Sequence, residues 1–159
     1  MMVLPFSLII NGKKNDFIAK IWRSILHINQ EKDAETSAFF EKLSKEDQAK
    51  IDRVKPKLHT IRRDQSDLCK KGMDIEPVVS DDSPSQLQFA PILKCLNIQR
   101  ITIEYQEAKI VVTVDGRILS YEEGENLAVN DGFDNLEDFY AYFDYSFKGK
   151  LIHWTELVY

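Results

Sequence analysis

The stretch from residue 101 to residue 119 constrains the fold most, because it predicts three short strands in direct succession. Residues 101–105 alternate between apolar and polar side chains, and residues 110–114 are rich in β-branched side chains. The dipeptide Asp115-Gly116 is a strong two-residue hairpin turn and leads into residues 117–119. Several strands joined by hairpins predict a small barrel or a strongly curved sheet.

Helical patterns flank this strand-rich stretch. Apolar residues recur at helical spacing over residues 17–26 and predict a helix with one buried face. Residues 30–53 are highly charged and predict a helical insertion on the surface. Two further helix starts carry a capping pattern: Ser120 with Glu123, and Asp134 with Glu137. Further strands are predicted over residues 6–10, 73–79 and 150–154, and Gly149 is expected to end the region before the last of them.

Length and composition favour one domain over residues 1–159. The chain has 159 residues, of which 43% are hydrophobic, and this is enough for one core. No apolar run approaches the roughly 20 residues that cross a bilayer, so we expect a cytoplasmic protein with no membrane partner. The two cysteines, Cys69 and Cys95, form no CxxC pair, and the three histidines are scattered. We therefore expect neither a metal nor another cofactor.

The charge distribution bears on the kind of ligand. The formal net charge of −5 argues against broad binding to phosphate backbones. Seven cations nevertheless fall within nineteen positions: Arg53, Lys55, Lys57, Arg62, Arg63, Lys70 and Lys71. A local basic cleft would favour a nucleotide-sized ligand or a short single-stranded RNA over duplex DNA.

The segment from Lys57 to Arg63 is the main candidate for chemistry. If it is extended, Thr60 and Arg62 share one face of the strand, while His59 and Arg63 share the other. A lysine beside a threonine hydroxyl and a guanidinium can bind or attack a small polar substrate. The alternative is a charged edge strand, since lysine and proline commonly protect such edges.

This segment and the residues after it carry a resemblance to a known family. The sequence has Lys57, then Thr60-Ile61-Arg62, then Lys70-Lys71-Gly72-Met73-Asp74. It resembles the ASCH-domain group of the PUA-like superfamily, and most closely the small bacterial N4-acetylcytidine amidohydrolases. The chain departs from that family's pattern in three ways: Lys55 replaces a usual glycine, Arg63 precedes Asp64, and Met73 separates Gly72 from Asp74.

The resemblance implies a catalytic set of lysine, threonine and glutamate. Lys57 and Thr60 match the first two, and alignment of residues 128–131 places Asp131 at the glutamate. Threonine needs a neighbouring base, and a lysine serves when burial or a nearby cation lowers its pKa. Arg62 supplies such a cation and can bind the substrate or a developing oxyanion. The alternative for Asp131 is a simple Asp-Gly turn.

Aromatic residues form a second candidate group. Trp154, Tyr140 and Phe133 can stack on a base, or they can fill the core between helices and strands. The substrate-binding residues predicted beside the catalytic set are Arg62, His59, Arg63 and Trp154. His153, next to Trp154, is expected to be a packed or surface histidine rather than a catalyst.

We therefore predict one α+β domain: a small PUA-like or ASCH β-barrel flanked by helices, with residues 13–53 as a helical elaboration. The leading functional hypothesis is a metal-independent amidohydrolase for an N-acylated cytosine nucleoside or a similar small amide. The rival is a non-catalytic ASCH module that binds a small nucleoside-like ligand or short single-stranded RNA in the same cleft. A third hypothesis assigns residues 30–53 to binding a partner protein. The oligomeric state is left open.

Overall fold

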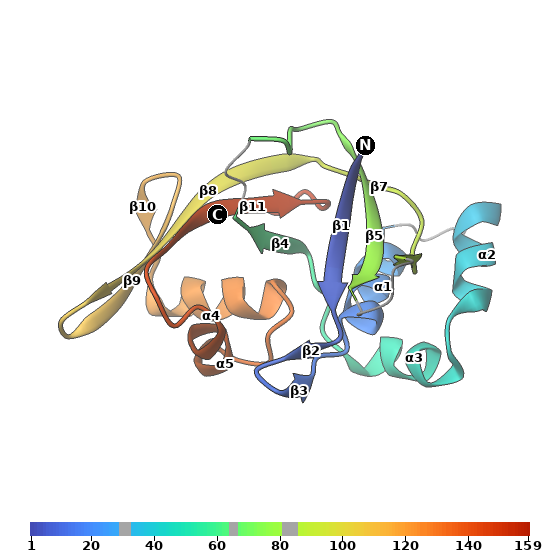
Figure 1. Ribbon diagram of the computed structural model, residues 1–159, viewed down its shortest axis with the longest axis horizontal. Coiled ribbons are helices and arrows are strands. Elements are labelled where there is room, and N and C mark those ends of the chain that lie inside the picture. Colours follow the sequence, from blue (N-terminus) through green and yellow to red (C-terminus); the bar gives the residue numbers. More distant parts are fainter. Residues whose placement is uncertain (29–32, 64–66, 81–85) are drawn as a thin grey trace.

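The computed structural model describes residues 1–28, 33–63, 67–80 and 86–159 (Figure 1). Within these ranges the chain forms five α-helices and three β-sheets, which confirms the α+β class. No helix in the described ranges combines the length and the apolar character needed to cross a membrane. Asp64 and the polar loop over residues 81–85 lie outside the described residues.

The smaller of the two main sheets contains the N-terminal strand. Strand β1 (Met2–Ser7) pairs in parallel with β5 (Asp74–Ser80), and β6 (Leu87–Gln88) and β7 (Leu93–Lys94) pair antiparallel with β5. The strand predicted over residues 6–10 is thus interrupted: β1 ends at Ser7, and β2 (Ile9–Ile10) forms a separate hairpin with β3 (Lys13–Lys14). Asn11 and Gly12 both have positive φ, which produces this turn.

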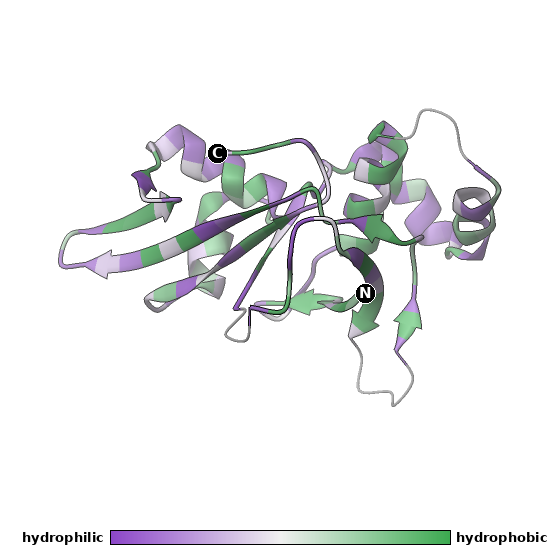
Figure 2. Cartoon of the chain, turned by 90° about the horizontal axis from the view of Figure 1, so that it is seen from above, coloured by the Kyte–Doolittle hydropathy of each residue, from purple (hydrophilic) through white to green (hydrophobic). Residues whose placement is uncertain are grey.

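The larger sheet has the strand order β10-β9-β8-β11-β4. Its strands are β8 (Asn97–Gln106), β9 (Lys109–Val114), β10 (Arg117–Ile118), β11 (Phe147–His153) and β4 (His59–Arg62). The predicted hairpin is confirmed: Asp115 and Gly116 have φ of 49° and 82°, as a type I′ turn requires. Figure 2 shows hydrophilic and hydrophobic residues alternating along these strands.

Gly149 was predicted to end the region before the last strand, and this prediction is wrong. It lies inside β11, because its lack of a side chain lets β4 approach closely. A Cβ atom at this position would lie 2.5 Å from the carbonyl oxygen of Arg62. Glycine inside a strand commonly marks such a close approach of two backbones.

Three α-helices and one 3₁₀ helix lie between the β2–β3 hairpin and β4 in the described part of the chain. Helix α1 (Phe17–Ile28) packs its apolar face into the core, as predicted, and Trp22 is fully buried. Helices α2 (Ala34–Lys42) and α3 (Lys45–Lys50), followed by the 3₁₀ helix η1 (Ile51–Arg53), confirm the helical prediction for the described part of residues 30–53. Asp33 and Ser44 cap α2 and α3 through bonds of 2.7 and 3.0 Å to backbone N–H groups.

Helices α4 (Tyr121–Asn130) and α5 (Leu136–Tyr142) lie together against the larger sheet (Figure 1). The capping box of Ser120 and Glu123 is confirmed, with both reciprocal hydrogen bonds present. The predicted cap of α5 is shifted by one residue. Asn135 accepts the capping bond, at 2.8 Å, because the carboxylate of Asp134 instead pairs with Lys20 at 2.9 Å.

Two hydrophobic clusters hold these layers together. One joins α1 to the smaller sheet and includes Phe6, Trp22 and Trp154, and the other joins α4 and α5 to the larger sheet. In the described part of the chain, no sheet closes into a barrel. Instead β1 and β4 are both edge strands, and Arg62 bridges them by donating to the Pro5 carbonyl oxygen at 2.6 Å.

Candidate functional site

Lys57 and Asp131, which are 74 positions apart, meet at the start of β4. The Lys57 Nζ atom lies 3.1 Å from Asp131 Oδ1 and also donates to the carbonyl oxygen of Asp131. Their side chains are only 1% and 6% exposed. Two of the three predicted catalytic residues therefore form a buried ion pair.

Backbone hydrogen bonds fix the position of this pair. The N–H of Lys57 donates to the Lys20 carbonyl oxygen in α1 at 2.9 Å, and the N–H of Leu58 donates to the Asn130 carbonyl oxygen in α4 at 2.7 Å. Asp131 is the C-cap of α4, and Gly132 follows with a φ of +96°. The Asp-Gly turn is thus present, and it directs the carboxylate of Asp131 toward Lys57.

A single carboxylate oxygen collects three contacts. Oδ1 of Asp131 accepts from the Ile61 N–H at 3.0 Å and from Lys57, and it lies 3.3 Å from His59 Nδ1. The contact with His59 is close but is not aligned as a full hydrogen bond. Because β4 is an edge strand, the carboxylate satisfies an N–H that would otherwise face no partner.

Burial controls the protonation of these groups. Loss of solvent lowers the pKa of Lys57, Asp131 opposes this shift, and the positive charges of Arg62 and Lys20 add to it; the net result is a pKa of about 8. Burial alone would raise the pKa of Asp131, but Lys57 and His59 together hold it below its ordinary value. The site therefore contains an ionised carboxylate beside an amine that loses its proton near pH 8.

Thr60 and Arg62 follow Lys57 along β4. Thr60 is 3% exposed, and its hydroxyl makes no hydrogen bond within the described residues. The guanidinium carbon of Arg62 lies 5.1 Å from the ring centre of Phe6, and Lys57 Nζ lies 6.0 Å from the same ring. Two cations near one aromatic ring thus flank the strand position that carries Thr60.

Of the other predicted substrate-binding residues, His59 contacts Asp131, whereas Arg63 and Trp154 make their contacts elsewhere. His59 is fully buried and turns toward the C-terminal residues. Arg63 is exposed and stacks on Phe147, 5.3 Å from the ring centre, because strand alternation sends it away from Arg62. Trp154 is buried in the core and donates its ring N–H to Ser24 Oγ at 3.1 Å. Of the two roles considered for it, base stacking and core filling, this position fits core filling.

The basic residues of positions 53–71 do not gather in one cleft. Lys57 and Arg62 are largely buried, whereas Arg53 and Lys55 line a separate hollow that also contains Asp16 and Asp134. Closeness in sequence did not produce closeness in space, since an extended segment sends neighbouring side chains to opposite faces.

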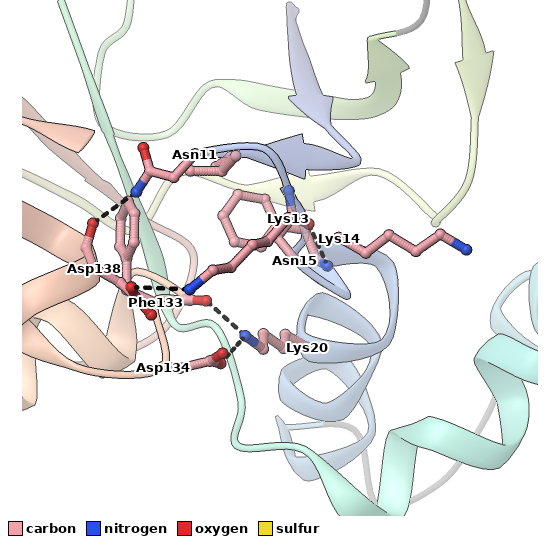
Figure 3. A pocket seen from close by; sticks show the side chains of 11 residues that line it. Asn11, Lys13, Lys14, Asn15, Lys20, Phe133, Asp134 and Asp138 are labelled. Atoms are coloured by element: carbon pink, nitrogen blue, oxygen red, sulfur yellow. Dashed lines mark hydrogen bonds and ion pairs between the residues drawn. The ribbon is translucent and has the colours of Figure 1, made fainter. Parts of the chain in front are cut away.

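A small pocket of about 50 Å³, shown in Figure 3, is lined in part by Gly132, the residue after Asp131. Lys20 reaches across it to the Gly132 carbonyl oxygen at 2.8 Å and to Asp134. Phe17 and Gly132 line the pocket and also cover Lys57, whose Nζ atom lies 4.7 Å from the Phe17 ring centre. The Phe17 ring is therefore the barrier between this pocket and the buried amine.

The sequence did not reveal Lys20 or Phe17 as site residues. Both lie in the helix over residues 17–26, where Phe17 belongs to the apolar stripe and Lys20 to the polar side. Such a pattern signals only an amphipathic helix. Within the described ranges, no three His, Cys, Asp or Glu side chains are grouped so that they could hold a metal.

No protein-family model, characterised protein or solved structure matches this chain. A function can therefore be inferred only from the geometry of the Lys57–Asp131 pair and its surroundings.

Proposed function

We propose that this chain is a metal-independent amidohydrolase that acts on an N-acylated cytosine nucleoside or a similar small amide. The observation that carries the proposal is the buried contact between Lys57 and Asp131, three positions before Thr60, a buried threonine whose hydroxyl makes no hydrogen bond in the described residues. A lysine whose pKa is lowered to about 8 is partly neutral near physiological pH, as a general base must be.

The proposed reaction has two halves. Neutral Lys57 removes the hydroxyl proton of Thr60, and the Thr60 oxygen attacks the amide carbon. Arg62 stabilises the negative charge on the carbonyl oxygen, and the Lys57 ammonium returns its proton to the leaving amine as the C–N bond breaks. Water, deprotonated by Lys57, then cleaves the Thr60 ester, releases the carboxylic acid and restores the hydroxyl. Asp131 orients the Lys57 amine throughout.

We also propose that the fold is a PUA-like barrel that is open between β1 and β4. Arg62 bridges the two edge strands through the Pro5 carbonyl oxygen, at the place where a closed barrel would have backbone pairing. An opening there would leave the Thr60 face of β4 beside Phe6. In this proposal the substrate enters through the pocket of Figure 3, and the Phe17 ring moves aside.

The decisive assay is cytidine release from N4-acetylcytidine, followed by chromatography. We expect Thr60→Val, which removes the hydroxyl but keeps the side-chain shape, to reduce turnover by at least about 100-fold. The wild-type rate should rise with pH through an apparent pKa of about 8. Thr102→Val on β8 is the matched control, because its hydroxyl bonds to Thr113 instead. Full turnover by a folded Thr60→Val variant would overturn the threonine mechanism.

A second function, the binding of a nucleotide or short single-stranded RNA without turnover, is favoured by the lining of the pocket. Lys13, Lys14 and Lys20 line it with the rings of Phe17 and Phe133, which can contact a phosphate and a base. The phosphate would compete with Asp138 and Asp134, which pair with Lys13 and Lys20. Binding of a labelled short RNA should weaken in Lys13→Ala and with added salt. Cytidine release that requires Thr60 would favour the enzyme over this alternative.

A further inference from the structure

A row of buried and partly buried polar groups continues from Asp131 to Tyr159. The Tyr159 hydroxyl lies 2.7 Å from His59 Nε2, and the Asn130 amide nitrogen lies 2.9 Å from the same hydroxyl. On the other side of the ring, His59 Nδ1 lies 3.3 Å from Asp131 Oδ1. Four side chains thus connect in the order Asn130, Tyr159, His59 and Asp131.

The chemistry of these groups assigns their protons. An amide nitrogen can only donate, so the Tyr159 oxygen accepts from Asn130 and its own proton is left for His59 Nε2. His59 Nε2 is then the acceptor, and the ring proton of the neutral imidazole lies on Nδ1. This nitrogen lies 3.3 Å from the Asp131 carboxylate oxygen, where a bare lone pair would be repelled.

The histidines of this region stay neutral near physiological pH. Burial lowers the pKa of His59, and burial together with His59 lowers the pKa of His153 to about 3. The two rings lie 5.2 Å apart, and neither ring nitrogen of His153 has a hydrogen-bond partner within the described residues. His153 therefore contributes bulk, while His59 alone connects Tyr159 to the ion pair.

The C-terminal segment holds the Tyr159 ring in place. The backbone N–H of Tyr159 donates to Gln99 Oε1 at 3.0 Å, and Gln99 Nε2 donates to the carbonyl oxygen of Tyr159 at 2.9 Å. Thr155 donates to the Leu58 carbonyl oxygen at 3.3 Å, beside Lys57. The segment after β11 is therefore fastened both to β8 and to the start of β4.

We propose that His59 and Tyr159 are positioning residues of the Lys57–Asp131 pair, which hold the Asp131 carboxylate toward Lys57 from the face of β4 opposite Thr60. The consequence for catalysis depends on the proposed function, whereas the proton arrangement itself does not. The His59 N–H shares the charge of the Asp131 carboxylate with Lys57. Without that N–H the carboxylate attracts the ammonium more strongly, and the pKa of Lys57 rises. A smaller fraction of the amine is then neutral and able to accept a proton near neutral pH.

The charged groups that act on Lys57 come from three elements. Asp131 follows α4, Arg62 lies on β4, and Lys20 lies on α1. His59 adds only a dipole, so its removal should change the titration of Lys57 without changing the net charge of the site. We expect the titration midpoint of Lys57 to rise by about one pH unit in His59→Leu.

The test uses nuclear magnetic resonance of the full chain, with labelled histidine and lysine. In the wild type, the ring proton of His59 should lie on Nδ1, and the Lys57 Cε signal should titrate near pH 8. Tyr159→Phe should weaken the preference for the Nδ1 proton and raise the Lys57 midpoint. Tyr121→Phe, at an exposed tyrosine, should change neither. A ring proton on Nε2 in the wild type would overturn the proposal.

Two further variants separate positioning from simple packing. His59→Asn keeps an N–H donor near Asp131 and should leave the Lys57 midpoint close to the wild-type value, unlike His59→Leu. If His59→Leu does not fold, Tyr159→Phe is the deciding variant. An unchanged titration midpoint of Lys57 in Tyr159→Phe would refute the proposed positioning role. A protein that shows the expected proton positions but releases no cytidine would refute the proposed function and leave this inference standing.

Discussion

Breaking the Lys57–Asp131 pair from either side should give opposite dependences of stability on pH. In Lys57→Met, the buried Asp131 loses its cation and must bind a proton on folding. In Asp131→Asn, the buried Lys57 loses its anion and must release a proton on folding. The first variant should lose stability as pH rises, and the second should gain it.

The structure limits the size of both effects. The ordinary pKa values are 3.8 for aspartate and 10.5 for lysine. Neutralising the remaining partner at pH 7 therefore costs at most about 4 kcal/mol for Asp131 and about 5 kcal/mol for Lys57. These limits agree with the roughly 3–5 kcal/mol typical of breaking a buried ion pair. The slopes should reach up to about 1.4 kcal/mol per pH unit, negative for Lys57→Met and positive for Asp131→Asn.

The wild type supplies the reference between pH 5 and pH 7. In this range Lys57 is protonated and Asp131 ionised in both the folded and the unfolded state, so the pair adds no slope of its own. The double variant, in which neither charge remains, should run parallel to the wild type and be more stable than either single variant.

Urea unfolding at pH 5, 6 and 7 measures these differences. The two tryptophans, Trp22 and Trp154, are buried and report unfolding by fluorescence. Lys94→Met is the matched control, because Lys94 pairs with Asp74 where both side chains are about half exposed. This exposed pair should contribute less than about 1 kcal/mol with little slope. Parallel slopes in the two single variants of the buried pair would refute the reasoning.

Three further substitutions test close packing around the site. Gly132→Ala places a Cβ atom 2.8 Å from the Phe17 ring at a φ of +96° and should lower the free energy of unfolding by about 2 kcal/mol or more. Gly116→Ala is the control, because Gly116 also has a positive φ but faces open space, and it should lower the free energy of unfolding by less. Gly149→Ala meets the β4 backbone at 2.5 Å and should lower the melting temperature by several degrees, so an unchanged melting curve would contradict the close approach of β4 and β11. Trp154→Phe removes a buried hydrogen bond and should cost about 1–2 kcal/mol in urea unfolding.

Local patterns predicted the elements whose cause is local. The turn at Asp115-Gly116 and the capping box of Ser120 and Glu123 depend on residues within four positions of each other, and both formed as predicted. Gly149 and Asp134 were misinterpreted because their surroundings come from far away in the sequence. The backbone of β4 approaches Gly149, and Lys20 binds Asp134 across 114 positions.

The candidate site divides in the same way. Lys57, Thr60 and Arg62 lie in one short segment, so the sequence could show that a lysine, a threonine hydroxyl and an arginine are close along the chain. Only the family resemblance indicated Asp131, and no pattern indicated Tyr159. The contact of Tyr159 with His59 spans 100 positions and depends on how the C-terminal segment returns to β4.

The burial of Lys57 needs a physical explanation that packing alone does not supply. Its side chain is among the largest that are fully buried, beside Phe6 and Trp22, and an apolar side chain of similar volume would fill that space with no desolvation penalty. Asp131 could satisfy the Ile61 N–H without any cation nearby. What the ammonium adds is a proton that leaves near pH 8. Lys57 lies just before the strand that carries Thr60, and the Phe17 ring separates it from the pocket. We therefore propose that this group serves proton transfer and not structural support alone.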